Sequence, residues 1–191
     1  MKKGLLIILS GPSGVGKGTV RKYICSKKTV DFEYSISMTT RAPRDNEKDG
    51  VEYYFVSKEE FLKRIEEDKF LEHAEFVGNY YGTPKDKVEE LRNEGKNVLL
   101  EIEINGATQV LEKTKDDDGV ISFFLVPPSL KKLEERIRAR KSEPEEVIKL
   151  RLEKGRKEME NAKFYDYTIK NDRVANAGNK IIEILKKKMS E

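Results

Sequence analysis

The amino-acid sequence predicts an α/β fold in which helices flank a parallel sheet and a smaller mixed sheet is inserted into the chain. Two observations predict the parallel sheet. Apolar runs at 5–9, 98–104 and 120–126 barely alternate with polar residues, and a helical pattern follows each run. The third observation is the different texture of residues 35–95, where short alternating segments predict a separate small sheet.

The first apolar run, Leu5 to Leu9, follows two lysines and therefore resembles the start of a signal peptide. The run is too short for one and lacks a cleavage site of small residues, so a buried strand is the better interpretation. A helix is expected next, at 17–27. No stretch of the sequence approaches the roughly 18 apolar residues that a membrane span needs.

The inserted region is expected to contain strands at 52–56 and 70–77 and two helices. One helix should begin at Ser57, which has a glutamate at the capping-box position three residues later. The other helix, at 84–94, opens with proline, and Gly95 would end it.

Beyond the insert, Ser129 is placed to cap a helix. The pattern predicts, in chain order, helices at 105–113 and 129–140, a charged helix-turn-helix over 133–163 with its break near 141–144, a strand at 167–169 and a helix at 174–188. The chain of 191 residues fits one domain.

The composition gives little indication of a macromolecular partner. Lys plus Arg number 38 and Asp plus Glu number 35, so the net charge of +3 predicts neither a nucleic-acid nor a membrane partner. Cys25 is the only cysteine, which excludes an internal disulfide and fits a reducing, cytoplasmic compartment. We expect Cys25 to be a packing residue.

A glycine-rich segment between the first strand and the first helix carries the strongest chemical signal. Its residues are Gly11-Pro12-Ser13-Gly14-Val15-Gly16-Lys17. Glycines let the backbone amides turn toward phosphate oxygens, the helix adds its positive dipole end, and Lys17 can reach the outer phosphates. The alternative is a strand-to-helix turn that binds nothing. Gly18 stands where a Ser or Thr hydroxyl normally contacts magnesium, and Thr19 follows it.

A second group of residues, Ser37 to Arg44, places two arginines three positions apart beside several hydroxyl side chains. Paired guanidinium groups suit a dianionic phosphate because each offers planar, bidentate donors. Surface arginines are usually solvated, so the pair alone leaves both interpretations open. Together with the glycine-rich loop, it predicts a second phosphate site.

At this point the chain resembles the guanylate kinase family. The resemblance is carried by the loop above, by Ser37-Met38-Thr39-Thr40-Arg41-Ala42-Pro43-Arg44, by Gly78-Asn79-Tyr80-Tyr81-Gly82-Thr83 and by Glu101-Ile102-Glu103-Ile104-Asn105-Gly106. It implies a P-loop NTPase-type parallel sheet flanked by helices, with an inserted small mixed-sheet GMP-binding region and a helical lid. The implied boundaries within the single domain are a core of 1–34, 96–132 and 164–191, an insert of 35–95 and a lid of 133–163.

The resemblance also implies the site residues. ATP would be bound by Gly11, Pro12, Ser13, Gly14, Val15, Gly16, Lys17, Gly18, Thr19 and, at the adenine, Asn171. GMP would be bound by Ser37, Arg41, Arg44, Tyr53, Glu72, Tyr81, Thr83 and Glu103. Catalysis would depend on Lys17, Arg41, Arg136, Arg140 and Arg151. Magnesium would be held mainly through ATP phosphates and water, with no side chain assigned as a metal ligand.

Chemistry supports Glu72 as the guanine acceptor, because guanine presents the N1 hydrogen and the 2-amino group side by side as donors. Without the resemblance, an exposed strand residue would be the better interpretation of Glu72. Glu103 replaces the shorter Asp that is usual in the family. Glu101 is expected to orient water around magnesium. Lys141 stands where the family often has a hinge glycine.

The expected activity is phosphorylation of GMP, and of dGMP, by ATP to give GDP. The alternatives are a non-catalytic guanylate kinase-like binding module and a kinase for another nucleoside monophosphate. The partners would be the two small-molecule substrates, with no nucleic acid and no membrane, and the chain would be a monomer or weak homo-oligomer.

Overall fold

The computed structural model describes residues 2–139 and 144–190, which form two sheets. The five-stranded sheet has the order β2-β7-β1-β8-β9. Its strands are β1 (Leu6–Ser10), β2 (Glu33–Tyr34), β7 (Val98–Glu101), β8 (Val120–Val126) and β9 (Tyr167–Lys170). β2 pairs with β7 in parallel, and β8 pairs with β9 in parallel. The predicted α/β fold with a parallel sheet is confirmed.

The chain divides into two compact units. The first comprises Met1–Leu6, Phe32–Leu100 and Asn105–Gly119, and the second comprises Ile7–Asp31, Glu101–Ile104 and Val120–Glu191. The boundaries expected for a core, an insert and a lid stay a prediction.

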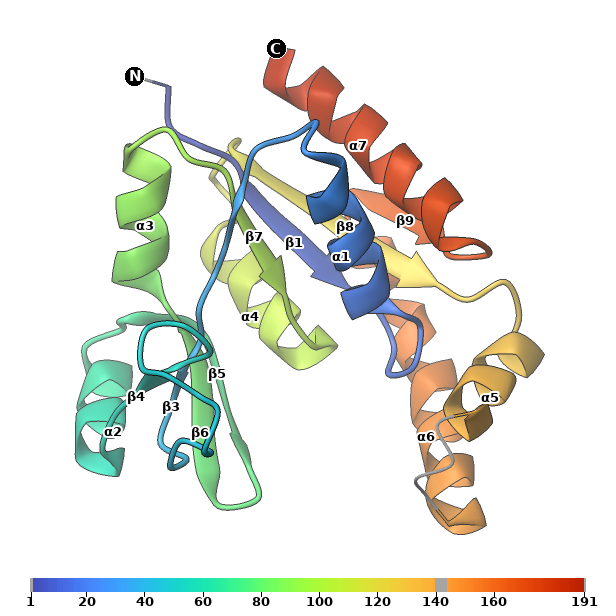
Figure 1. The fold of residues 1–191 in the computed structure, drawn as a ribbon, viewed down its shortest axis with the longest axis horizontal. Helices are drawn as coiled ribbons and strands as arrows, with labels where there is room; N and C mark the ends of the chain where they lie inside the picture. The colour runs from blue at the N-terminus through green and yellow to red at the C-terminus, as the bar shows by residue number, and fades with distance from the viewer. Residues whose placement is uncertain (1, 140–143, 191) are drawn as a thin grey trace. The chain divides into compact units, whose positions relative to one another are not determined.

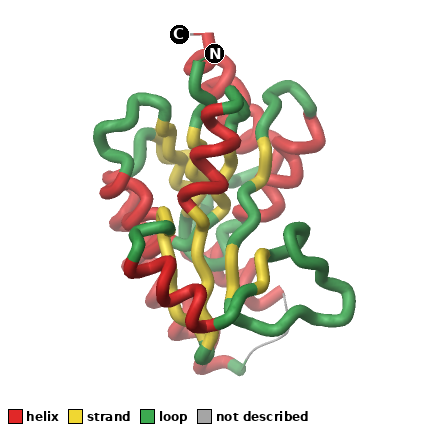
Figure 2. The backbone as a smooth tube through the Cα atoms, turned by 90° about the vertical axis from the view of Figure 1, so that its left-hand side faces the viewer, coloured by secondary structure: helices red, strands yellow, loops and turns green. Residues whose placement is uncertain are grey.

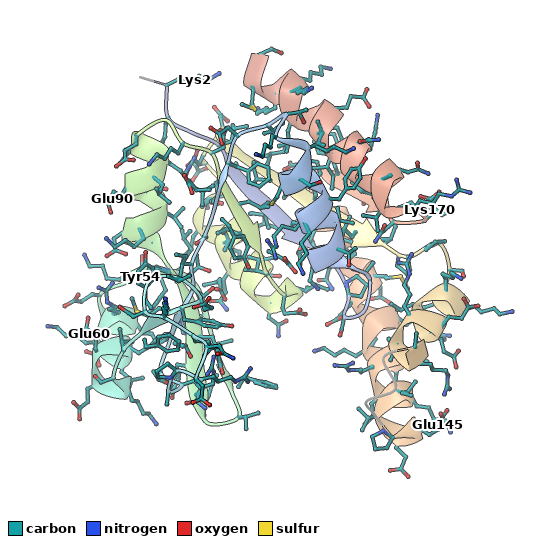
Figure 3. All side chains as sticks on the ribbon, viewed as in Figure 1. Lys2, Tyr54, Glu60, Glu90, Glu145 and Lys170 are labelled. Atoms are coloured by element: carbon teal, nitrogen blue, oxygen red, sulfur yellow. The ribbon has the colours of Figure 1, made fainter. Side chains whose placement is uncertain are left out.

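The first unit contains the small sheet, of order β4-β3-β6-β5. Its elements are β3 (Met38–Thr39), β4 (Tyr54–Phe55), β5 (Phe70–Phe76), β6 (Asn79–Pro84), α2 (Lys58–Glu66), α3 (Lys85–Asn93) and most of α4 (Ile104–Lys113). The sheet is mixed, as predicted, because β3 runs parallel to β4 and antiparallel to β6. Tyr54 and Glu60 mark β4 and α2 in Figure 3.

Aromatic packing holds this small sheet against α2. The rings of Phe61 and Phe70 stack with their centroids 4.3 Å apart, and buried Met38 completes the cluster. The strand expected at 52–56 is shorter than predicted, since β4 covers only Tyr54–Phe55 and follows a loop (Figure 2). The Asp49 carboxylate in this loop accepts the Phe55 amide hydrogen at 2.8 Å.

Local capping follows the sequence. The Ser57 hydroxyl accepts the Glu60 amide hydrogen at 3.1 Å, which confirms the predicted start of α2. Nε of Arg64 donates to Oε1 of Glu60 at 2.9 Å, so one oxygen of this carboxylate faces along the helix. The strand predicted to reach residue 104 was too long: β7 ends at Glu101, since α4 begins at Ile104.

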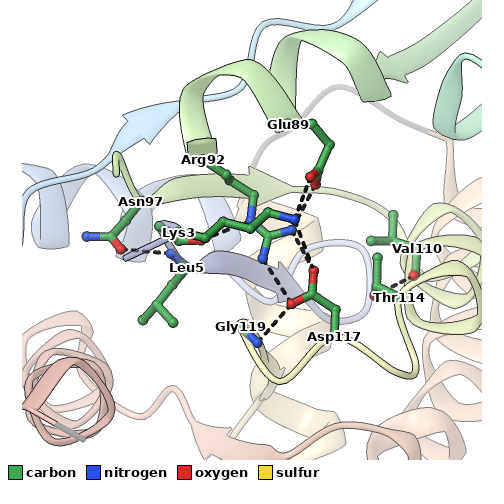
Figure 4. Close-up of polar contacts among 10 residues, drawn as sticks. Lys3, Leu5, Glu89, Arg92, Asn97, Val110, Thr114, Asp117 and Gly119 are labelled. Atoms are coloured by element: carbon green, nitrogen blue, oxygen red, sulfur yellow. Dashed lines mark hydrogen bonds and ion pairs between the residues drawn. The ribbon is translucent and has the colours of Figure 1, made fainter. Parts of the chain in front are cut away.

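A buried arginine joins distant parts of the first unit (Figure 4). Arg92 is fully buried, and its Nη1 donates to Glu89 at 2.9 Å and to Asp117 at 2.8 Å. Its Nε donates to the carbonyl of Gly4 at 2.9 Å. Two backbone hydrogen bonds of 2.8 Å also hold the N-terminal segment, one from Gly4 N to the Arg92 carbonyl and one from Leu6 N to the Gly119 carbonyl. These bonds and the Arg92 side chain together fix this segment.

The second unit contains α1 (Lys17–Lys27), α5 (Leu130–Ala139), α6 (Glu145–Glu158), a 3-10 turn (Met159–Phe164) and α7 (Val174–Ser190). Helices α1 and α7 lie side by side (Figure 1), and so closely that a Cβ on Gly178 would lie 2.3 Å from the Tyr23 ring. Cys25 is exposed on α1, so its expected packing role was wrong.

Helices α5 and α6 pack on each other through a small apolar cluster of Leu133, Ile137 and Ile148. The Ser129 hydroxyl accepts the Lys132 amide hydrogen at 3.1 Å, as predicted for the cap of α5. The predicted break near 141–144 lies largely outside the described residues. Within residues 2–139 and 144–190, no helix is long and apolar enough to cross a membrane.

Candidate functional site

The glycine-rich loop of the second unit has the backbone geometry that the sequence predicts. It follows the fully buried strand β1 and leads into α1, and Gly16 stands at the helix N-cap with φ 100°. A side chain at Gly16 would be strained at this φ, and its Cβ would also lie 2.9 Å from Nδ2 of Asn171. The loop therefore brings backbone and the positive end of α1 close to any bound anion.

Lys17 is held in this loop by two oxygen atoms. Its Nζ donates to the Gly11 carbonyl at 2.7 Å and lies 3.2 Å from Oε1 of Glu103. The Lys17 side chain is 10% exposed, whereas that of Glu103 is 67% exposed. The ammonium group is thus fixed beside the loop, and Glu103 partners a lysine here; its predicted contact with guanine stays a prediction.

Arg136, predicted to act in catalysis, and Asn171, predicted to meet the adenine of ATP, both contact the loop. The Val15 carbonyl accepts hydrogen bonds from Nη1 of Arg136 at 3.0 Å and from Nδ2 of Asn171 at 2.8 Å. Arg136 Nη2 also donates to the Asn171 carbonyl at 2.8 Å. Among the described residues, the buried Oδ1 of Asn171 has no hydrogen-bond partner. The proposed contacts of both residues with ATP are not shown by these bonds and stay predictions.

A cavity of about 440 Å³ opens beside the loop. It is lined by Ser13, Gly14, Gly16, Lys17, Gly18, Thr19, Arg21, Lys22, Glu101 and Glu103. Nε of Arg21 donates to Oε2 of Glu101 at 2.6 Å, and Oε1 of Glu101 would lie 3.3 Å from a Cβ on Gly18. A carboxylate oxygen therefore stands near the position where a hydroxyl is missing. The sequence reasoning missed Arg21, although it lies one helical turn after Lys17 and so shares its face of α1.

Of the two remaining lid arginines, the structure describes Arg151. Arg151 lies half-buried on α6. Arg140, predicted to act with it, lies outside the described residues, as does Lys141 at the predicted hinge.

The first unit holds Arg41 in a defined place directly after β3. Its Nη2 donates to Oε1 of Glu47 at 2.8 Å, and its guanidinium lies over the Tyr53 ring at 5.4 Å. Oε2 of Glu47 accepts the Arg44 amide hydrogen at 2.9 Å. This backbone hydrogen bond is the main reason why the pKa of Glu47 lies below its ordinary value, and the Arg41 hydrogen bond adds to the effect.

Glu47 was missed by the sequence reasoning, although an acidic residue three positions after Arg44 was a visible signal. Tyr81 is brought to the same place, because its ring meets the Tyr53 ring edge-on at 6.2 Å and it pairs with Thr39 of β3. The Arg44 side chain is exposed and Ser37 is half-buried. Arg41, Tyr53 and Tyr81 therefore lie together. Arg44 is linked to them through its backbone amide, which donates to Glu47.

A buried carboxylate lies on the same small sheet. Glu72 pairs with Thr83 in register, is 9% exposed, and accepts the Thr83 hydroxyl hydrogen at 2.6 Å. Burial raises the pKa of Glu72, and the hydrogen bond from Thr83 opposes that rise. The alternative of an exposed strand residue is excluded. A buried carboxylate with a raised pKa is typical of a functional site.

A buried strand, a glycine-rich loop and a helix that begins with lysine define a phosphate-loop nucleotide-binding protein of the α/β class. The guanylate kinase family model matches residues 3–188. The chain belongs to the guanylate kinase family.

Relatives and solved structures agree with this placement. A guanylate kinase of Bacillus cereus is 53% identical over 184 residues, which cover 96% of this chain and 88% of the relative. A guanylate kinase of Mesoplasma florum is 54% identical over 183 residues, or 96% of this chain. A crystal structure of guanylate kinase from Anaplasma phagocytophilum has a TM-score of 0.73 at 32% identity, covering 100% of this chain and 89% of that one.

The relatives differ in length. The chain spans 61% of the Mesoplasma florum protein and 61% of a guanylate kinase of Mycoplasma capricolum.

Proposed function

We propose that this chain is a guanylate kinase, which transfers the terminal phosphoryl group of ATP to GMP, and to dGMP, and produces ADP and GDP. The observation that carries the proposal is the small sheet of the first unit, which combines the buried Glu72–Thr83 pair with the Arg41–Tyr53 cluster. One group suits a base that donates hydrogen bonds, and the other suits a phosphate.

Recognition of guanine would depend on Glu72 in its ionised form. A carboxylate can accept the N1 hydrogen and the 2-amino hydrogen together, whereas adenine presents a bare acceptor nitrogen at the first of these positions. A site built for such donors rejects analogues that lack them by roughly 10⁴-fold. The burial of Glu72 favours this role, because little water competes for its oxygens.

The ATP phosphates would lie at the glycine-rich loop, with Lys17 at the outer phosphates and Asn171 toward the adenine. The Gly11 carbonyl and Glu103 hold the Lys17 ammonium beside the loop, and a cation fixed in this position favours the assigned role at the outer phosphates. Arg136 and Arg151, with Arg140, are the further cations that we assign to the ATP phosphates.

The reaction needs no side-chain base, because a GMP phosphate oxygen is already anionic near neutral pH. Arg41 would bind and orient that phosphate, Lys17 would neutralise charge on the donor phosphates, and closure of the lid would exclude water. The single cysteine of the sequence supports the cytoplasmic setting in which we place this reaction.

The residues at the loop fit a magnesium ion that is bound mainly through ATP phosphates and water. Gly18 supplies no hydroxyl, but the Glu101 carboxylate stands beside it and can hydrogen-bond metal-bound water. When bound, magnesium neutralises phosphate charge.

A coupled assay of ADP release with GMP, dGMP, AMP and UMP as acceptors tests the proposal. We expect strong preference for the two guanine nucleotides, and we expect Glu72→Gln to weaken it. No turnover with any monophosphate would refute the kinase and favour a binding module, while a preference for AMP or UMP would refute the assigned substrate.

A further inference from the structure

We propose that Gly106 is a specificity-determining residue of the guanine site, because its missing side chain leaves the space that the Glu72 carboxylate occupies. The inference rests on the proposed role of Glu72 in binding guanine. Gly106 acts as a positioning residue: it sets where a neighbouring carboxylate can lie and makes no contact of its own with the base.

The space at Gly106 is filled by one side chain. A Cβ built on Gly106 would lie 2.7 Å from Oε2 of Glu72, 3.2 Å from its Cδ and 3.3 Å from its Cγ. The first distance is shorter than van der Waals contact allows, so alanine at this position forces something to move. All three atoms belong to Glu72, and the closest is the end of a flexible side chain.

The helix is held more firmly than the carboxylate. Gly106 lies in the first turn of α4, between Ile104 and Ala107, which are 5% and 0% exposed, and Val110 one turn later is also fully buried. The backbone at Gly106 is not in the left-handed region, so alanine fits the helix there. Alanine is also the better helix former of the two residues. The Glu72 carboxylate is therefore the group that gives way.

Displacement of this carboxylate would damage base recognition in particular. Oε1 of Glu72 is tied to the Thr83 hydroxyl at 2.6 Å, and Oε2 is the oxygen that faces Gly106. Pushing Oε2 away rotates the carboxylate, so it can no longer meet two parallel donors on one base edge. Binding of GMP should therefore be weakened more than binding of inosine monophosphate, which has the N1 hydrogen but lacks the 2-amino group.

The experiment compares wild type and Gly106→Ala in steady-state assays with GMP and with inosine monophosphate at saturating ATP. For Gly106→Ala we expect the KM for GMP to rise about ten- to a hundredfold, the range for a lost hydrogen bond to a charged group. The GMP preference should fall, with kcat nearly unchanged and a melting temperature at or above that of wild type. Glu112→Ala, an exposed change on the same helix, is the control and should keep wild-type kinetics.

A second comparison separates this role from a general effect on packing. In the Glu72→Gln background, Gly106→Ala should raise the KM for GMP far less than it does in the wild-type background. The reason is that both changes act on the same side chain. Equal losses in both backgrounds, a lowered melting temperature, or unchanged GMP selectivity would each overturn the inference. A wild-type chain that does not phosphorylate GMP would instead refute the proposed function and remove the basis of the inference.

Discussion

Replacing Arg92 with methionine should unfold the protein at a markedly lower temperature. The change removes a buried guanidinium that bonds Glu89, Asp117 and the Gly4 carbonyl, while most of its apolar stem is kept (Figure 4). Because Arg92 is fully buried, no water replaces its hydrogen bond to the Gly4 carbonyl without rearrangement. The effect should therefore be on folding and not on nucleotide binding.

The size of the destabilisation follows from the carboxylates that Arg92→Met leaves without their partner. Breaking a buried ion pair by removing one partner costs about 3–5 kcal/mol. The side chains of Asp117 and Glu89 are 29% and 32% exposed, so both carboxylates regain some hydration and the lower end applies. A loss of about 3 kcal/mol lowers the melting temperature of a chain of this size by roughly 6–12 °C.

The loss should also depend on pH. The Arg92 hydrogen bond, followed by that of the Gly119 amide, holds the pKa of Asp117 below its ordinary value. A carboxylate with a lowered pKa in the folded state stabilises the fold above its unfolded pKa, and that contribution disappears as the pH falls through the folded pKa. The difference between wild type and Arg92→Met should therefore narrow in acid.

Circular dichroism melting curves at neutral pH and at pH about 3, below the ordinary aspartate pKa, measure both effects. Lys87→Met is the matched control: it removes a cation from the same helix, α3, but the Lys87–Glu90 pair is exposed, with side chains 51% and 60% accessible. Exposed pairs contribute about 0–1 kcal/mol. If Arg92→Met melts within about 2 °C of Lys87→Met at neutral pH, the reasoning about burial is refuted.

Three further predictions concern the two sites. Lys17→Met should lower kcat by about 10²–10³-fold at saturating substrates, and a smaller loss in the coupled assay would contradict its role at the phosphates. Glu47→Gln should raise the KM for GMP severalfold and spare kcat, because Arg41 loses its charged partner; a change in kcat alone would argue against this. Since burial raises the pKa of Glu72, its ionised form destabilises the fold above that pKa, so Glu72→Gln should melt higher than wild type at pH about 8 and should lose this advantage near pH 4. Melting curves at both pH values test this prediction. If the variant melts at a lower temperature than wild type at pH 8, the ionised Glu72 does not destabilise the fold.

Much of the fold was predictable from the sequence because its signals are local. The glycines and the lysine of the loop at residues 11–17 are contiguous in the sequence. The hydroxyls of Ser57 and Ser129 likewise cap helices by accepting an amide hydrogen three residues later. The apolar strands are equally clear, since both faces are covered. The family resemblance then led to the correct family.

The site contacts that escaped prediction join residues far apart in the chain. Periodicity does not show that Gly106 lies against Glu72, because this depends on how α4 meets β5. Nor does it show that Glu103 pairs with Lys17, since the strand was expected to continue past the residue where it ends. Glu47 lies in a loop, where the pattern of side chains carries no regular spacing.

The bonds that fix the N-terminal segment have a consequence for the order of events during synthesis. Gly4 and Leu6 leave the ribosome well before their backbone partners, Arg92 and Gly119, which are made only after most of the first unit. At about 5–20 residues per second, the apolar segment stays unpaired for on the order of ten seconds. The nascent chain should therefore be a better chaperone substrate before Gly119 emerges than after it.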